Sequence, residues 1–237
     1  MYFSGTEEIV VDHAAPQRGV MSTVAFGRAA APRGAPLDIV RVLDILIALV
    51  VLIFLFPAMV VVALAIKAQD GGPVFFRQTR VGYAGRTFTC WKFRTMVVDA
   101  EARLKALLEQ SPAARLEWAA DQKLRDDPRI TWLGDFLRKS SLDELPQILN
   151  VLKGEMSLVG TRPIVLNEVE KYGRWFRHYC AVRPGVTGLW QISGRNDVSY
   201  DKRVAFDVAF ARSQSVGLYL RILIATVPAV LMRNGSY

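Results

Sequence analysis

A long apolar segment near the N-terminus constrains this chain most strongly. From Ile45 to Ile66, 22 consecutive residues are uncharged, and most are Leu, Ile, Val or Ala. A helix of this length is roughly 33 Å long, enough to cross the hydrocarbon core of a bilayer. Globular domains rarely hold a helix that is apolar on all sides, so a membrane location is favoured over a buried core helix. We therefore predict a membrane helix over residues 41–68.

The segment has two features that favour re-entry over crossing. Pro57 lies just past its middle, where proline removes a helical hydrogen bond and predicts a kink. Basic residues flank both ends, namely Arg33, Arg41, Lys67 and Arg77. A straight crossing would leave one basic flank outside, against the positive-inside tendency, whereas a kinked helix that returns keeps both flanks cytoplasmic. We therefore expect a re-entrant helix.

The rest of the chain divides around this helix. Residues 1–40 mix Ala, Pro, Gly and Arg without a structural period, which predicts a disordered cytoplasmic leader. Residues 69–237 suit one domain with its own core. A net charge of +8 points to anionic partners such as nucleic acid, anionic lipid or a nucleotide-sugar. The two cysteines, Cys90 and Cys180, are too few for a disulfide framework and lack metal-ligand spacing.

An adjacent carboxylate pair, Asp143 and Glu144, begins a second patterned segment. Apolar residues follow it at helical spacing: Leu145, Ile148, Leu149 and Leu152. The pattern predicts a short helix that ends at Gly154. Ser141 and Glu144 have the S-x-x-E spacing of a capping box, and Pro146 is compatible with the first turn. The pair is therefore predicted to lie in the first turn of this helix.

Two interpretations of the pair remain open on these residues alone. Acidic residues at helix starts commonly cap the helix and complement its dipole, without any chemistry. Cationic neighbours favour chemistry, because Arg138 and Lys139 precede the pair and Arg162 follows a strand-like segment at 156–159. Carboxylates flanked by guanidinium groups suit a site for phosphates and a metal ion, where an aspartate can be the nucleophile.

Two β-rich segments, 74–81 and 86–93, are separated by a turn at 82–85 and predict a hairpin. Lys92 and Arg94 are two residues apart and are expected to share a face, as a basic patch. Such a patch suits phosphate, a lipid headgroup or single-stranded nucleic acid. The adjacent membrane segment argues against nucleic acid.

The C-terminal segment, Val216 to Met232, is apolar except for Arg221. Its uninterrupted part, 222–232, is too short to span a bilayer, so we expect a helix that lies in the membrane interface. The predicted fold class is α+β. It consists of a single catalytic domain on the cytoplasmic face, built from the hairpin and short helices and anchored by the re-entrant and interfacial helices.

Three segments resemble the bacterial sugar transferase family, in the family's order. They read GPVFFRQTRVGYAGRTFTCWKFRTM, SSLDELPQILNVLKGEMSLVGTRP and RPGVTGLWQISGRN. The likeness extends from about Arg41 to the C-terminus and is strongest to the exopolysaccharide galactose phosphotransferases. It implies transfer of a hexose 1-phosphate, galactose or glucose, from a UDP-sugar to undecaprenyl phosphate at the bacterial inner membrane. UMP is released, and the reaction starts exopolysaccharide repeat-unit synthesis.

The resemblance also implies roles for single residues. Asp143 would be the nucleophile that carries the phosphosugar, and Glu144 would hold Mg²⁺. Phosphate binding is implied for Lys92, Arg94, Arg138 and Arg162. Nucleotide-sugar contacts are implied for Arg183, Gln191 and Arg195. The chain departs from the family's usual pattern at Phe56, often Ser, and at Thr161, usually Pro. The expected partners are a UDP-sugar, undecaprenyl phosphate and membrane lipid, without nucleic acid, and a homo-oligomer is left open.

Two other functions remain open. One is a metal-dependent phosphotransferase without a covalent intermediate, in which both acids are metal ligands. The other is a membrane-anchored scaffold of a polysaccharide assembly complex, which binds anionic lipid and uses the acids only as a helix cap. UMP formation from a UDP-sugar separates the scaffold from the enzymes.

Overall fold

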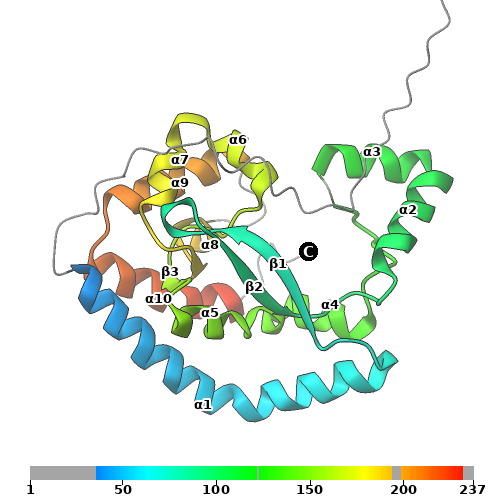
Figure 1. Ribbon diagram of the computed structural model, residues 1–237, viewed down its shortest axis with the longest axis horizontal. Coiled ribbons are helices and arrows are strands. Elements are labelled where there is room, and N and C mark those ends of the chain that lie inside the picture. The colour runs from blue at the N-terminus through cyan, green and yellow to red at the C-terminus, as the bar shows by residue number, and fades with distance from the viewer. Residues whose placement is uncertain (1–35, 122, 194–198, 232–237) are drawn as a thin grey trace, which may run out of the picture. The chain divides into compact units, whose positions relative to one another are not determined.

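The computed structural model describes residues 36–121, 123–193 and 199–231. Apart from residues 36–40, the expected leader lies outside this part of the chain. Helix α1, Pro36–Asp70, already includes those five residues, so the helix begins earlier than the predicted residue 41. It continues through Pro57 and is bent along its course (Figure 1). Many of its side chains are exposed, as at Phe54, and the helix is long and apolar enough to cross a membrane.

The predicted hairpin is confirmed. Strands β1, Phe75–Val81, and β2, Thr87–Phe93, pair antiparallel, with Phe75 opposite Phe93. The turn between them contains the short 3-10 helix η1, Tyr83–Gly85. On β2, Phe88 and Cys90 are buried on one face, and Lys92 continues that face at the end of the strand.

The remaining elements are short, and the predicted α+β character is confirmed for the described residues. The helices are α2, Ala100–Gln110, α3, Pro112–Asp121, α4, Trp132–Lys139, α5, Gln147–Lys153, α6, Val169–Tyr172, α7, Phe176–Cys180, α8, Leu189–Ile192, α9, Tyr200–Arg212, and α10, Val216–Leu231. Short 3-10 turns are η2, Leu142–Glu144, η3, Leu166–Glu168, and η4, Gly173–Trp175. Strands β3, Ser157–Val159, and β4, Gly185–Thr187, pair parallel as a second small sheet.

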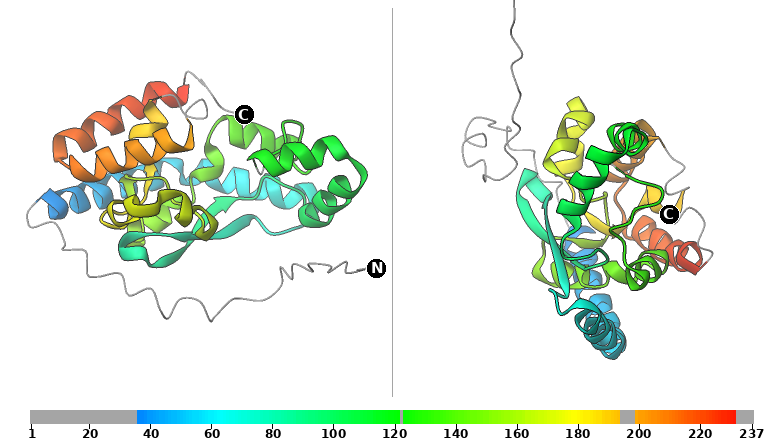
Figure 2. Two further views of the ribbon diagram at one scale, coloured as in Figure 1. Left: turned by 90° about the horizontal axis from the view of Figure 1, so that it is seen from above. Right: turned by 90° about the vertical axis from the view of Figure 1, so that its right-hand side faces the viewer.

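The main core lies where α1, the hairpin, α5, β3 and α10 meet. Its buried members include Ala48, Cys90, Val151, Leu158 and Ile222, one from each of these elements. Helix α10 lies beside α1 and also contacts the second sheet (Figures 1 and 2). The carboxylate segment, which precedes α5, therefore packs close to α1.

A buried polar contact fastens α1 to this core. Asp44, 1% exposed, accepts hydrogen bonds from Ser157 Oγ at 3.0 Å, Leu158 N at 2.8 Å and Tyr219 OH at 2.9 Å. One helical turn earlier, Arg41 donates to the carbonyl oxygens of residues 151 and 152, at the end of α5. Paired groups of this kind are expensive to separate, because each would be left buried without a partner. The first turns of α1 are therefore held to the domain by directional bonds as well as by apolar packing.

Candidate active site

The carboxylate pair lies in a 3-10 turn and not in the first turn of α5. Ser141 has φ 58, in the left-handed region, and its side chain makes no capping bond. The predicted capping box is therefore wrong: residues 142–144 form η2, and α5 begins only at Gln147, after Pro146. The predicted helix end is confirmed, since Gly154 at φ 83 is the C-cap. The break leaves both acids projecting from a turn, where neither is used as a helix cap.

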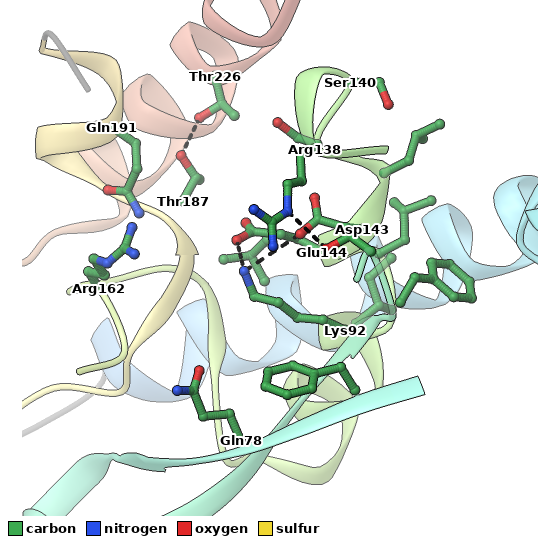
Figure 3. A pocket seen from close by; sticks show the side chains of 18 of the residues that line it. Gln78, Lys92, Arg138, Ser140, Asp143, Glu144, Arg162, Thr187, Gln191 and Thr226 are labelled. Atoms are coloured by element: carbon green, nitrogen blue, oxygen red, sulfur yellow. Dashed lines mark hydrogen bonds and ion pairs between the residues drawn. The ribbon is translucent and has the colours of Figure 1, made fainter. Parts of the chain in front are cut away.

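Lys92 holds the two carboxylates together. Its Nζ lies 2.5 Å from Glu144 Oε1 and 3.7 Å from Asp143 Oδ2 (Figure 3). Burial raises the pKa of Asp143 to about 6, although the Lys92 ammonium opposes the rise. Burial acts in the same direction on Glu144, but Lys92 lies closer to it and holds the pKa of that carboxyl below its usual value. The site therefore contains one firmly ionised acid and one that titrates just below neutral pH.

Arg138 and Arg162 are among the other cations that line the same pocket, which has a volume of about 680 Å³. Arg138, on α4, lies beside Asp143, and its Nε donates to Thr95 Oγ1 at 2.9 Å (Figure 3). Arg162 lies across the pocket from the acids, next to Gln191 (Figure 3). The pocket thus has a wall with acids and cations and an opposite wall with a guanidinium and an amide.

The two apolar helices α1 and α10 also line this pocket. Val51 of α1 and Thr226 and Ala229 of α10 contribute side chains to it. On α1, the neighbours of Val51 include the exposed apolar residues Val50 and Ile53. The acids and cations therefore share one pocket with side chains of the two apolar helices.

The structure places Arg94 differently from Lys92. Arg94 lines the pocket, but its guanidinium forms a bidentate ion pair with Asp70, the last residue of α1, with Nη1 2.8 Å from Oδ2. Bidentate pairs of this kind are directional and strong. The side chain thus ties the end of the hairpin to the end of α1, and phosphate binding by Arg94 stays a prediction.

Of the three residues predicted to contact the nucleotide-sugar, the structure places one in the pocket. Gln191 lines the pocket. Arg183 is not among the described lining residues, because its Nε donates to the carbonyl oxygen of Gly154 at 3.0 Å, at the far end of α5. Arg195 lies outside the described residues.

Arg80 is a pocket residue that the sequence analysis missed. Its guanidinium donates to the carbonyl oxygen of Pro163 at 3.0 Å and to Gln78 Oε1 at 2.6 Å. Phe76, Gln78 and Arg80 alternate along β1 and all line the pocket. In the observed register Phe76 lies opposite Lys92, so the two-residue period of the hairpin was the signal that could have found Arg80.

The acids fit a metal ion that arrives with substrate better than a resident one. Among the residues that the structure describes, no group of three or more His, Cys, Asp or Glu side chains could hold a metal. Mg²⁺ is commonly bound by one or two carboxylates together with substrate phosphates and water. Asp143 and Glu144 can supply that donor set, so the chain is compatible with Mg²⁺ bound jointly with a diphosphate.

Comparison with known proteins identifies the family. Residues 37–233 match the family described as bacterial sugar transferase. The chain belongs to the bacterial sugar transferase family. The likeness inferred from three sequence blocks is therefore confirmed.

Several curated members of the bacterial sugar transferase family are close relatives. The chain is 49% identical over 197 residues to the exopolysaccharide production protein ExoY of Sinorhizobium fredii, covering 83% of this chain and 87% of that protein. It is 48% identical over 197 residues to the undecaprenyl-phosphate galactose phosphotransferase of Salmonella typhimurium, covering 83% and 41%. It is 37% identical over 205 residues to the UDP-glucose:undecaprenyl-phosphate glucose-1-phosphate transferase of Escherichia coli, covering 83% and 41%. The chain thus spans most of ExoY but well under half of the two named phosphotransferases.

Proposed function

We propose that this chain transfers a hexose 1-phosphate from a UDP-sugar to undecaprenyl phosphate and releases UMP. The observation that carries the proposal is the shared pocket, in which Asp143 and Glu144 meet several cations beside residues of α1 and α10. A lipid phosphate and a water-soluble diphosphate can meet only at such a boundary. The names of the relatives supply the two substrates, and galactose is proposed as the sugar because the galactose enzyme is more similar than the glucose enzyme.

The proposed reaction has two displacements at one phosphorus atom. A carboxylate oxygen of Asp143 attacks the β-phosphorus of the UDP-sugar, and the bond from that phosphorus to the bridging oxygen breaks with its electron pair leaving on UMP. An oxygen of the lipid phosphate then attacks the same phosphorus and releases the Asp143 carboxylate. Two displacements replace one direct encounter between two large anionic substrates.

The other side chains of the pocket would stabilise negative charge on the reacting phosphates. Lys92 and Arg138 lie beside Asp143 and would stabilise the oxygens of the transferred phosphoryl group. Arg162 would stabilise the negative charge on the departing UMP. Glu144 would hold Mg²⁺, which neutralises diphosphate charge when bound.

Purified full-length protein in detergent, supplied with undecaprenyl phosphate and one UDP-sugar at a time, tests the proposal. UDP-galactose, UDP-glucose and UDP-N-acetyl sugars form the panel, and we expect UMP release with UDP-galactose. Release with another sugar would retain the reaction class and reject galactose. Absence of UMP with every sugar would reject the enzyme and favour the scaffold.

The pH dependence follows from the pKa of Asp143. Only the ionised carboxylate attacks, and burial raises its pKa to about 6. We therefore expect kcat/KM for the UDP-sugar to rise about tenfold per pH unit below pH 6 and to level off above it. Steady-state rates from pH 5 to 8 measure this, and a flat profile down to pH 5 would contradict the assignment of Asp143.

We also propose that α1 enters the inner membrane and returns, so that the domain stays on the cytoplasmic face. Contacts at both ends of the helix support this topology. Arg41 donates to the end of α5, and Asp70 pairs with Arg94 beside the hairpin. A spanning helix has its two ends on opposite sides of the bilayer, so one domain could not contact both of them.

An N-terminal tag and a membrane-impermeant label test this topology. In intact cells the tag should stay unlabelled, and it should become labelled after the inner membrane is permeabilised. Labelling in intact cells would show that the N-terminus is periplasmic and would require a spanning helix.

A further inference from the structure

The pocket wall opposite the acids includes Trp190 and Gln191, which both carry a buried polar atom without a partner, and Arg203 stacks on Trp190. Among the described residues, Trp190 Nε1, Gln191 Oε1, Tyr200 OH and Arg203 Nε make no hydrogen bond. Trp190 is 3% exposed, so its indole N–H is shielded from bulk water. An unpaired buried polar atom costs about 1–3 kcal/mol, and native proteins hold few of them. Three of them belong to Trp190, to its chain neighbour Gln191 and to Arg203, which stacks on the Trp190 ring, and this clustering indicates that a polar ligand supplies the missing bonds.

Two guanidinium groups lie on the same indole. The Cζ atoms of Arg162 and Arg203 are 5.2 Å and 4.9 Å from the Trp190 ring centroid. Within the described part of the chain neither arginine forms an ion pair, and the neighbouring acid, Glu168, lies 3.9 Å from Arg80 instead. Burial lowers the pKa of Arg203, and the nearby charge of Arg162 lowers it further. Two neighbouring cations without acidic partners favour a bound anion.

Helix α9 sets this arrangement. Arg203 and Asp207 are four residues apart and so lie on one face of α9. Asp207, 2% exposed, accepts hydrogen bonds from Tyr172 OH at 2.6 Å and from the backbone N–H of Arg162. The same helix therefore supplies one guanidinium and positions the backbone that carries the other.

We propose that Arg162 and Arg203, stacked on Trp190, bind the α-phosphate of the nucleotide-sugar, which becomes the phosphate of the departing UMP. This inference rests on the proposed function. In Figure 3, Arg162 and Gln191 lie across the pocket from Asp143 and Glu144, so a diphosphate whose β-phosphorus faces Asp143 extends its α-phosphate toward this wall. When the bridging bond breaks, the α-phosphate gains a negative charge, and the paired guanidiniums stabilise it.

The unpaired groups favour a nucleotide over the lipid phosphate as the source of the anion. Trp190 Nε1 and Arg203 Nε can only donate, Gln191 Oε1 can only accept, and Tyr200 OH can do both. A nucleoside offers donors and acceptors to match them, whereas the polyprenyl chain behind a lipid phosphate offers none. Arg203 is therefore assigned to the donor substrate.

The test compares UMP with uridine, which lacks the phosphate. Equilibrium binding of each is measured on purified full-length protein in detergent for wild type, Arg203→Ala, Arg203→Lys and the control Arg212→Ala. Arg212 is on the same helix but stacks on Trp175 and not on Trp190, which lines the pocket. Loss of charge-assisted bonds should weaken UMP binding by about 10- to 100-fold in Arg203→Ala, with uridine changed by less than about twofold. Arg203→Lys should lose less, and Arg212→Ala should bind both like wild type.

Each other outcome would overturn the inference. Unchanged UMP binding in Arg203→Ala, or an equal loss of affinity for UMP and uridine, would show that Arg203 does not bind the phosphate and only packs against Trp190. A higher KM for undecaprenyl phosphate with unchanged UMP binding would assign the arginine to the lipid. If Arg203→Ala does not fold, Arg203→Lys decides by the same comparison. Binding is measured without turnover, so a wild-type protein that binds UMP but releases none from UDP-sugars would reject the proposed function separately.

Discussion

Replacing Asp143 by Asn should lower UMP release by at least about 10³-fold, the scale seen when a catalytic nucleophile is removed. The amide has nearly the same shape but no negative charge with which to attack phosphorus. In wild type, a UDP-sugar labelled in the β-phosphate should leave label on the protein when undecaprenyl phosphate is withheld, and in the variant it should not. Both are measured on purified protein, by UMP release and by label retained after denaturation.

Asp135→Asn is the matched control. Asp135 is on α4, exposed, and pairs with Lys139 at 2.7 Å, outside the pocket. It should keep wild-type activity. Asp143→Asn should also remain folded, because the raised pKa means that the folded state favours a neutral group at this position. A folded Asp143→Asn protein with full activity would reject the covalent mechanism.

Replacing Lys92 by Met should lower turnover at pH 7 by about 10²-fold, the scale for losing one preorganised electrostatic partner. Lys92 is the cation that contacts both acids, at 2.5 Å and 3.7 Å. Without it, Asp143 and Glu144 repel each other across a short distance and one of them takes up a proton more readily. The rise in kcat/KM with pH should therefore move from about pH 6 to at least one unit higher, and part of the lost activity should return at alkaline pH.

Lys153→Met is the control for this variant. Lys153 is in the last turn of α5, with Nζ 5.4 Å from the Trp91 ring centroid, and does not line the pocket. It should leave both rate and pH profile unchanged. An unaltered pH profile in Lys92→Met would show that Lys92 does not control the ionisation of the acids.

Much of the local structure was predictable because it depends on neighbouring residues. Alternating β-rich segments around a glycine turn produced the hairpin, and Gly154 ended α5 because glycine readily adopts positive φ. The capping box failed for a local reason that the pattern did not reveal. Ser141 adopts a left-handed conformation, so its hydroxyl cannot serve the turn that follows.

The sequence predicted which residues belong to the candidate site better than it predicted the ion pairs and hydrogen bonds that each of them forms. Lys92, Arg138 and Arg162 line one pocket with the acids, as expected. Arg94 pairs with Asp70, and Arg183 binds the end of α5. Nothing in residue spacing distinguishes a guanidinium that faces a pocket from one that caps a helix 29 residues away.

By itself, the sequence determined that this chain has a long apolar helix, a basic hairpin and an acidic pair within a sugar transferase family, because apolar length, alternation and motif are properties of consecutive residues. Only the tertiary structure decided which charges meet. Packing of α1, the hairpin, α5 and α9 brings Lys92 to residues about fifty positions away, Asp44 to Tyr219, and Arg162 to Arg203. These pairings depend on how elements pack over long sequence separations, and local patterns do not encode that geometry.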